Sequence, residues 1–281
     1  MNQLADTRDF LGRWKAAAMT FGPFCLGIDP SAELLRLWDL EDNVDGLARF
    51  CETVGGWVSG RVAAIKPQIA FFERFGSAGM GVLEGFVSEV RRQGNLTIID
   101  AKRGDIGTTA AAYGDAYFAS TSSLRTDGLT VHPYLGVSAL DAIFSRAHLV
   151  GGAVFVVVAS SNPDGLMLQA ATTSDSQQVA VAIARDVRRW NEGANAKVGG
   201  AVLGATRAGA LDSILEALGS APVLMPGIGA QGADFGDLTR LSGHERIIPS
   251  ASRSVLTAGR DRDAFMRTID AHIERARAAL V

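Results

Sequence analysis

Short apolar runs alternate with longer amphipathic stretches along most of the chain. Eight of these runs are rich in valine, isoleucine, leucine and alanine, a composition typical of parallel strands that are buried on both faces. The candidate strands are Phe24–Pro30, Val62–Gln68, Leu96–Arg103, Gly128–Tyr134, Ala153–Asn162, Lys197–Ala205, Pro222–Gly229 and Arg246–Arg253.

Between these runs, apolar residues recur at the spacing of a helix that buries one face. The clearest candidate helices are Val44–Val58, Ala78–Arg92, Gln177–Glu192 and Arg262–Ala279. A further helix, Thr7–Met19, is predicted ahead of the first strand. Eight strand-plus-helix units without a long linker predict an α/β fold, in which residues 1–281 form a single (β/α)8 (TIM) barrel domain.

The sequence also allows one alternative fold and predicts one long loop. A doubly wound sheet is the alternative fold, but no glycine-rich dinucleotide turn follows the first candidate strand. The segment Leu166–Asp175 is polar and rich in turn formers, so we expect a long loop after the fifth strand. Such a loop is a candidate lid over a site.

Composition narrows the class of protein. The 281 residues are 47% hydrophobic and 20% charged with a net charge of −3, which favours a globular protein and argues against a dedicated nucleic-acid binder. No apolar run reaches the roughly 20 residues of a membrane span, so no membrane partner is expected. The two cysteines, Cys25 and Cys51, make no disulfide framework, and a reducing, cytoplasmic setting is predicted.

Polar residues gather where the candidate strands end, which is where barrels of this kind place their chemistry. They are Asp29, Lys66, Asp100, Lys102, His132, Ser160, Ser161, Thr206, Gln231 and Arg253. Lysine is scarce, with four residues beside 23 arginines, yet two of the four stand at strand ends. Arginine does not replace lysine there if a proton must be given up.

The densest group is the run Asp100-Ala-Lys102-Arg-Gly-Asp105-Ile106-Gly-Thr-Thr109, which follows a buried candidate strand. Side chains two residues apart on a strand point the same way, so Asp100 and Lys102 are predicted to project together. Charges at the end of a buried strand are costly unless they pair or do chemistry.

This run resembles the D-x-K-x-x-D-I-x-x-T signature of the orotidine 5′-phosphate decarboxylase family, in its longer bacterial form. That family converts orotidine 5′-monophosphate (OMP) to uridine 5′-monophosphate (UMP) and CO2, the last step of UMP biosynthesis. The resemblance implies that Lys102 gives a proton to C6 of the pyrimidine and that Asp100 lies against the substrate carboxylate. It also implies that Lys66 joins their charge network.

The same resemblance implies a homodimer, because Asp105 and Thr109 would enter the neighbouring subunit's site, with Ile106 between them as a further substrate contact. It assigns Asp29 to the ribose hydroxyls and Ser161 to the pyrimidine edge, with Ser160 as the alternative. On pattern alone, Asp29 and the serines also suit ordinary turns.

The phosphate of the substrate is expected at the ends of strands seven and eight. The loop Pro226–Gly232, which contains Gly227 and Gln231, brings backbone N–H groups close to an anion, and the Arg253 guanidinium matches phosphate bidentately. By resemblance, Gln231 and Arg253 hold the phosphate.

No metal site and no cofactor are predicted, since the four histidines show no ligand spacing. His132 is interpreted as structural. Two other functions stay open: a metal-dependent sugar-phosphate decarboxylase or aldolase of the same barrel group, and a phosphate-binding barrel without catalysis. Loss of activity on chelation would indicate the first, and nucleotide binding without turnover would indicate the second.

Overall fold

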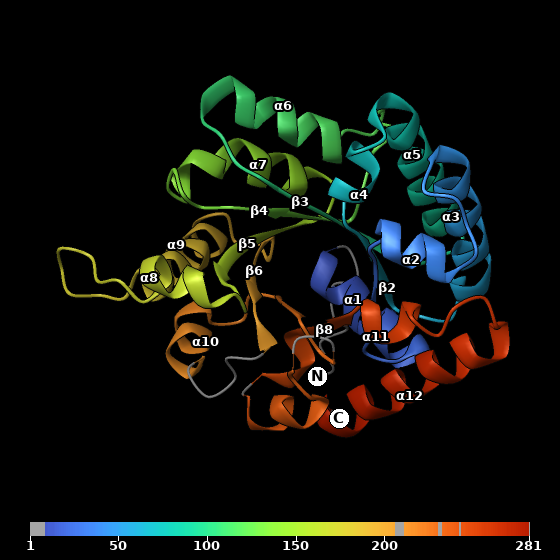
Figure 1. Cartoon of the computed structure of the whole chain (residues 1–281). Coiled ribbons are helices and arrows are strands. Elements are labelled where there is room, and N and C mark those ends of the chain that lie inside the picture. The colour runs from blue at the N-terminus through green and yellow to red at the C-terminus, as the bar shows by residue number, and fades with distance from the viewer. Residues whose placement is uncertain (1–8, 206–210, 230–231, 242, 281) are drawn as a thin grey trace.

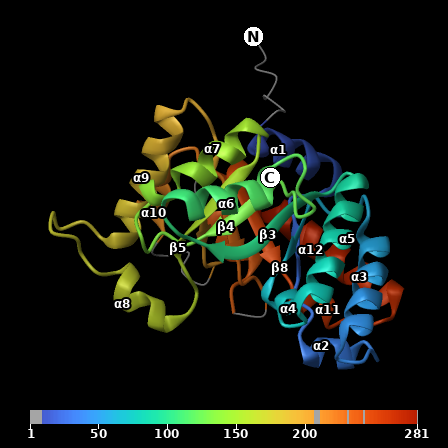
Figure 2. The same ribbon diagram turned by 90° about the horizontal axis from the view of Figure 1, so that it is seen from above.

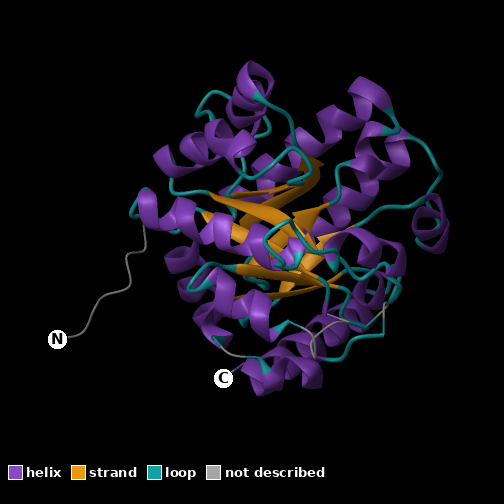
Figure 3. Cartoon of the chain, turned by 90° about the vertical axis from the view of Figure 1, so that its left-hand side faces the viewer, coloured by secondary structure: helices purple, strands orange, loops and turns teal. Residues whose placement is uncertain are grey.

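The structure is a computed structural model that describes residues 9–205, 211–229, 232–241 and 243–280. Its eight strands are all parallel and form a closed barrel in chain order, with the last strand paired to the first. Figure 3 shows these strands at the centre of the molecule, with helices around them. The strands are β1 (Cys25–Ile28), β2 (Ala64–Pro67), β3 (Leu96–Arg103), β4 (Gly128–Val131), β5 (Ala153–Ala159), β6 (Gly199–Leu203), β7 (Val223–Pro226) and β8 (Ile247–Ala251).

Helices surround the barrel (Figure 1). The longer ones are α1 (Phe10–Phe21), α3 (Val44–Val58), α5 (Gly76–Arg92), α6 (Gly107–Phe118), α7 (Asp141–Leu149), α9 (Val179–Gly193), α10 (Asp212–Leu218) and α12 (Arg262–Leu280). Short α-helices and 3-10 turns fill several connections: α2 (Ala32–Leu37), α4 (Ala70–Glu73), η1 (Ser138–Leu140), η2 (Pro163–Gly165), α8 (Leu166–Gln169), η4 (Phe235–Arg240), η5 (His244–Arg246) and α11 (Arg253–Leu256). Among the described helices, none is long and apolar enough to cross a membrane.

The predicted fold class is confirmed, and two elements, β3 and α3, have the predicted bounds. The other seven strands end one to three residues earlier than predicted, and β1, β4, β5 and β8 end directly before a polar residue. The extra N-terminal helix is present as α1, which begins at Phe10 because the side chain of Asp9 caps it by accepting a hydrogen bond from the Gly12 N–H.

The prediction of a loop over Leu166–Asp175 was wrong for its first four residues, which form α8. The sequence Leu-Met-Leu-Gln consists of good helix formers and continues directly from the turn η2. All three apolar side chains of α8 are exposed. In Figures 1 and 2, α8 and the loop after it stand out from the ring of helices.

Helix α1 closes the N-terminal end of the barrel. Its residues Phe10, Leu11 and Trp14 are buried in one cluster with side chains from the barrel interior. The ring of Phe10 meets Phe155 of β5 edge to face, at 5.3 Å between centroids. With this end filled, only the C-terminal ends of the strands are left to form a site inside the barrel.

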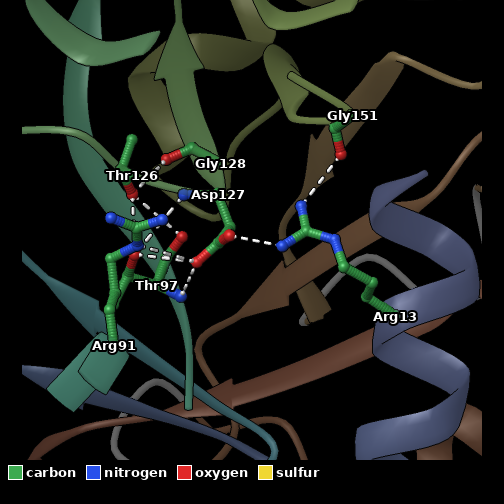
Figure 4. A network of polar contacts seen from close by, with 7 residues as sticks. All are labelled: Arg13, Arg91, Thr97, Thr126, Asp127, Gly128 and Gly151. Carbon is green, nitrogen blue, oxygen red and sulfur yellow. Dashed lines mark hydrogen bonds and ion pairs between the residues drawn. The ribbon is translucent and has the colours of Figure 1, made fainter. Parts of the chain in front are cut away.

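A polar network fastens α1 to the barrel (Figure 4). Asp127, just before β4, accepts a hydrogen bond from the Thr97 N–H at 3.0 Å and forms an ion pair with Arg13 of α1. Arg13 also donates to the carbonyl oxygen of Gly151 at 2.9 Å, and Arg91 pairs with Asp127 at 3.5 Å. The arginine therefore joins α1 to the starts of two neighbouring strands.

Arg13→Ala is expected to lower the free energy of unfolding by about 1–2 kcal/mol, since it removes one charge-assisted hydrogen bond to the buried carboxylate of Asp127 and another to the Gly151 carbonyl oxygen. Denaturant unfolding measures this change, and kcat should not move because the network lies at the far end of the barrel from the strand ends. Arg92→Ala is the control, because Arg92 is exposed and pairs with Glu89 on its own helix. Equal losses in the two variants would contradict the tethering role.

Candidate active site

A cavity of about 310 Å³ opens at the C-terminal ends of the strands. Every strand contributes to its wall, either at its last residues or just after them. The polar and glycine positions of the wall are Asp29, Lys66, Gln68, Asp100, Lys102, Thr130, Ser160, Ser161, Asn162, Gly204, Gly227, Ser250, Ser252 and Arg253. Seven of the ten predicted strand-end residues therefore line one cavity, as the barrel topology requires: Asp29, Lys66, Asp100, Lys102, Ser160, Ser161 and Arg253.

Three charged side chains form the centre of the site, and we call them the charge cluster: Lys66, Asp100 and Lys102. Asp100 accepts from Lys66 Nζ at its Oδ2 (3.0 Å) and from Lys102 Nζ at its Oδ1 (2.7 Å). The side chains of Lys66 and Asp100 are only 6% and 12% exposed, whereas Lys102 is 50% exposed. Lys66 and Asp100 thus form the buried part of the cluster, and the ammonium of Lys102 faces the cavity.

Burial and charge act in opposite directions on this cluster. Burial disfavours the ammonium of Lys66, but the carboxylates of Asp100 and Asp29 outweigh it and raise the Lys66 pKa. Burial likewise disfavours the carboxylate of Asp100, but Lys66 and Lys102 outweigh it and hold its pKa well below the usual range. Lys66 and Asp100 are therefore both ionised at neutral pH.

Asp100 and Lys102 meet as predicted, but not through regular strand alternation. The register between β3 and β4 shifts between Ile99 and Arg103, and Lys102 has a φ of +47°, in the left-handed region. A non-glycine residue rarely adopts this conformation, and such residues cluster at functional sites. The bulge, rather than the two-residue repeat, places the Lys102 ammonium on Asp100.

Thr130 of β4 is a site residue that the sequence analysis missed. Its hydroxyl donates to Asp100 Oδ1 at 2.8 Å and accepts from the Lys102 N–H at 3.0 Å. A threonine within an apolar strand is an ordinary strand former. Only its position on the strand next to the Asp100 run could have pointed to it.

Two further oxygens in the wall have no hydrogen-bond partner within the described part of the chain: Asp29 Oδ1 and Ser252 Oγ, both buried. Ser252 is accommodated because residue 27 of β1 is a glycine, where a Cβ atom would lie 2.7 Å from the Ser252 Cβ. Arg253 follows directly and is exposed. These groups can accept or donate hydrogen bonds to a polar ligand.

The two serines after β5 have different surroundings. The Ser160 hydroxyl accepts from Gln169 Nε2 of α8 at 2.8 Å and also bonds to Asn162, while its N–H donates to Gln169 Oε1 at 3.1 Å. Ser160 is thus engaged with α8. Ser161 also lines the cavity, and its backbone packs on Gly204, where a Cβ would lie 2.6 Å from the Ser161 nitrogen.

The second half of the Asp100 run does not reach the cavity of its own chain. Asp105 lies in the turn after β3, where its Oδ1 accepts from the Ile106 N–H at 2.8 Å. Ile106 and Thr109 are exposed at the start of α6, and none of the three belongs to the cavity wall.

The remaining predicted positions fall into three groups. Gly227 lines the cavity with a φ of +100°, a conformation that favours glycine. Gln231 and Thr206 lie outside the described residues. The ring of His132 packs against Gly104, where a Cβ atom would approach it to 2.8 Å, so its surroundings agree with a structural role.

Comparison with known proteins gives a consistent family. The sequence model described as "Orotidine 5'-phosphate decarboxylase / HUMPS family" matches residues 22–267. The chain is 46% identical to the orotidine 5′-phosphate decarboxylase of Myxococcus xanthus, covering 98% of this chain and 97% of that protein. It is 44% identical to the one of Salinispora arenicola, with 96% and 98% covered.

Solved structures agree with this result. A crystal structure assigned to orotidine 5′-phosphate decarboxylase from Streptomyces avermitilis superimposes with a TM-score of 0.90 and 41% sequence identity, covering 100% of this chain and 99% of that one. The charge cluster is formed by the residues that carry the resemblance in the sequence, Lys66 and the run from Asp100. The chain belongs to the orotidine 5′-phosphate decarboxylase / HUMPS family.

Proposed function

We propose that this chain decarboxylates OMP to UMP and CO2, with the charge cluster as its reacting centre. The observation that supports it most is a buried carboxylate, Asp100, held between two ammoniums at the C-terminal end of the barrel. The full-length similarity to orotidine 5′-phosphate decarboxylases supports the same reaction.

The reaction breaks the bond between C6 and the carboxylate, and the electron pair stays on C6. No neighbouring carbonyl delocalises that pair, so stabilisation must come from fixed charges in the site. The substrate carboxylate lies against Asp100, and CO2 leaves as the repulsion between the two is relieved. Lys102 Nζ gives its proton to C6 and is then recharged from solvent, to which it is half exposed.

The remaining wall residues bind the parts of the substrate that do not react. Asp29, with its unpartnered oxygen, accepts from the ribose hydroxyls. Ser161, which lines the cavity, contacts the pyrimidine edge. The backbone of Gly227 and the side chain of Arg253 hold the phosphate. The resemblance to the family adds Gln231, which lies outside the described residues.

Arg253→Ala is expected to raise KM for OMP by about 10–100-fold with a smaller change in kcat, because it removes a charge-assisted, bidentate contact far from C6. Steady-state kinetics over a range of OMP concentrations measure the change. Arg260→Ala is the control, since Arg260 is also exposed and lies outside the cavity wall. An unchanged KM in Arg253→Ala would remove the phosphate assignment.

We also propose a homodimer in which Asp105 and Thr109 complete the partner's site. The turns after β3 and β4 are in contact, since Gly104 packs on His132. Three large apolar side chains near them are more than half exposed: Ile106, Tyr134 and Leu135. An exposed apolar patch beside a site suits a contact with a second copy of the chain.

Mixing two inactive variants tests this arrangement. In a dimer of one Lys102→Ala chain and one Asp105→Asn chain, one site carries both changes and the other carries neither. Random subunit exchange should therefore restore about a quarter of wild-type activity. Lys102→Ala mixed with Asp100→Asn is the control and should stay inactive, because each change damages the cavity of the chain that carries it, so neither site of the mixed dimer is intact. No recovery in the first mixture would contradict the shared site.

We place the reaction in the cytoplasm, which the cysteines support. Cys25 and Cys51 are both free and buried. Burial raises the pKa of Cys25 to about 12, so this thiol is unreactive at neutral pH.

Substrate choice distinguishes this function from that of the metal-dependent sugar-phosphate decarboxylases. Purified protein is given either OMP or 3-keto-gulonate phosphate in buffer with Mg²⁺, and the products are separated by chromatography. We expect UMP from the first mixture and no reaction in the second. Conversion of the sugar phosphate alone would reassign the chain within its family.

A further inference from the structure

Thr130 of β4 is in direct contact with the charge cluster. It is 1% exposed, stands at the C-terminal end of β4 and lines the cavity. Its single hydroxyl donates to the Asp100 carboxylate at 2.8 Å and accepts from the Lys102 N–H at 3.0 Å. One atom thus bonds to two members of the cluster, one through its side chain and one through its backbone.

The bond to the Lys102 backbone supports an unfavourable conformation. The register shift takes Lys102 out of the regular β3–β4 ladder, and its φ of +47° is disfavoured for any residue with a side chain. A backbone N–H that leaves the ladder pairs with another acceptor. The Thr130 oxygen is that acceptor, so it fixes the bulge from which the lysine side chain extends.

The hydrogen bond from Thr130 to Asp100 keeps the carboxylate in place during the reaction. Asp100 Oδ1 accepts from both Lys102 Nζ and Thr130, while Oδ2 accepts from Lys66. When Lys102 becomes neutral after giving its proton to C6, its bond to Asp100 weakens because it is no longer charge-assisted. The Thr130 and Lys66 bonds stay and hold the carboxylate in place for the next turnover.

We propose that Thr130 is a positioning residue of the decarboxylation, one that sets the Lys102 bulge and the Asp100 orientation without touching the reacting atoms itself. This inference rests on the proposed function. Displacement of a reacting group by about 1 Å can cost about 100-fold in rate. Removal of the hydroxyl should therefore act on turnover more than on binding.

Thr130→Val removes the hydroxyl and keeps the shape. It is expected to lower kcat on OMP by about 10–100-fold and to change KM and the Kd for UMP by less than about threefold. Thr130→Ser keeps the hydroxyl and should return kcat to within about threefold of wild type. Circular dichroism and thermal unfolding show whether each variant is folded.

Thr97→Val is the matched control. Thr97 is also fully buried, on neighbouring β3, and its hydroxyl bonds to Thr126 and Asp127 at the N-terminal end of the barrel. This variant should lose thermal stability and keep its kcat. Similar kcat losses in Thr97→Val and Thr130→Val, or a Thr130→Val enzyme within twofold of wild type, would overturn the inference. A wild-type chain that does not convert OMP would instead overturn the proposed function.

Discussion

Lys102→Ala is expected to lower kcat on OMP by at least about 10⁴-fold while changing the Kd for UMP by less than about threefold. The change removes the ammonium that we propose both as the proton donor to C6 and as the positive charge that stabilises the electron pair left there. UMP has no carboxylate, and in the proposed site its ribose and phosphate contacts come from other residues. Because Lys102 is half exposed, the truncated chain should fold.

Assays of OMP conversion that are quenched at set times give kcat, and titration with UMP gives the Kd for UMP. Lys102→Arg separates the two roles, since arginine keeps the charge but does not readily give up a proton; it should remain severely impaired. Lys197→Ala is the matched control, because Lys197 is exposed and lies just before β6, at the opposite end of the barrel. Turnover near the wild-type rate in Lys102→Ala would eliminate this mechanism.

Asp100→Asn is expected to affect stability as well as turnover. It leaves Lys66 buried without its nearest counter-charge, and breaking a buried ion pair costs about 3–5 kcal/mol in free energy of unfolding. We expect a loss near the lower end, about 3 kcal/mol, because the amide oxygen still accepts from Thr130. Turnover should fall by about 10³-fold because Lys102 loses its orienting partner.

Chemical denaturation measures the loss, with Asp212→Asn as the control because Asp212 is exposed on α10. The folded pKa of Asp100 is lowered, so its contribution is complete above the unfolded value of about 4 and is lost only as pH falls below that. The folded pKa of Lys66 is raised, so its contribution is complete below about 10.4 and is lost above it.

The stability difference between wild type and Asp100→Asn should therefore be constant from about pH 5 to 9. It should shrink as the pH falls below about 4, where Asp100 of the unfolded wild type takes up a proton. A difference that vanished at neutral pH would show that the carboxylate is not ionised in the folded protein.

The barrel, and the placing of most charged residues at its strand ends, could be predicted because both depend on short-range patterns. Apolar runs indicated the eight strands along the chain, and a parallel barrel brings the C-terminal ends of all its strands to one face. The barrel places Lys66 and Asp100 on the same face, but the expectation that they meet, although they are 34 positions apart in the sequence, came from the resemblance to the family.

The parts that could not be predicted depend on contacts between elements. The bulge at Lys102 is fixed by Thr130 on another strand, and nothing in the local sequence marks it. Ser160 is occupied by Gln169 only because α8 folds back next to it. The run from Asp100 to Thr109 is continuous in sequence, yet its second half turns away from the cavity with α6, which a linear motif does not show.

The most direct measurement follows the ultraviolet absorbance of OMP mixed with purified protein that has been treated with EDTA. We expect complete conversion to the UMP spectrum, at the same rate with and without the chelator, because we propose that Lys66, Asp100 and Lys102 supply the charges that the reaction needs. No conversion in EDTA, with activity returning on addition of Mg²⁺, would contradict decarboxylation by the charge cluster alone.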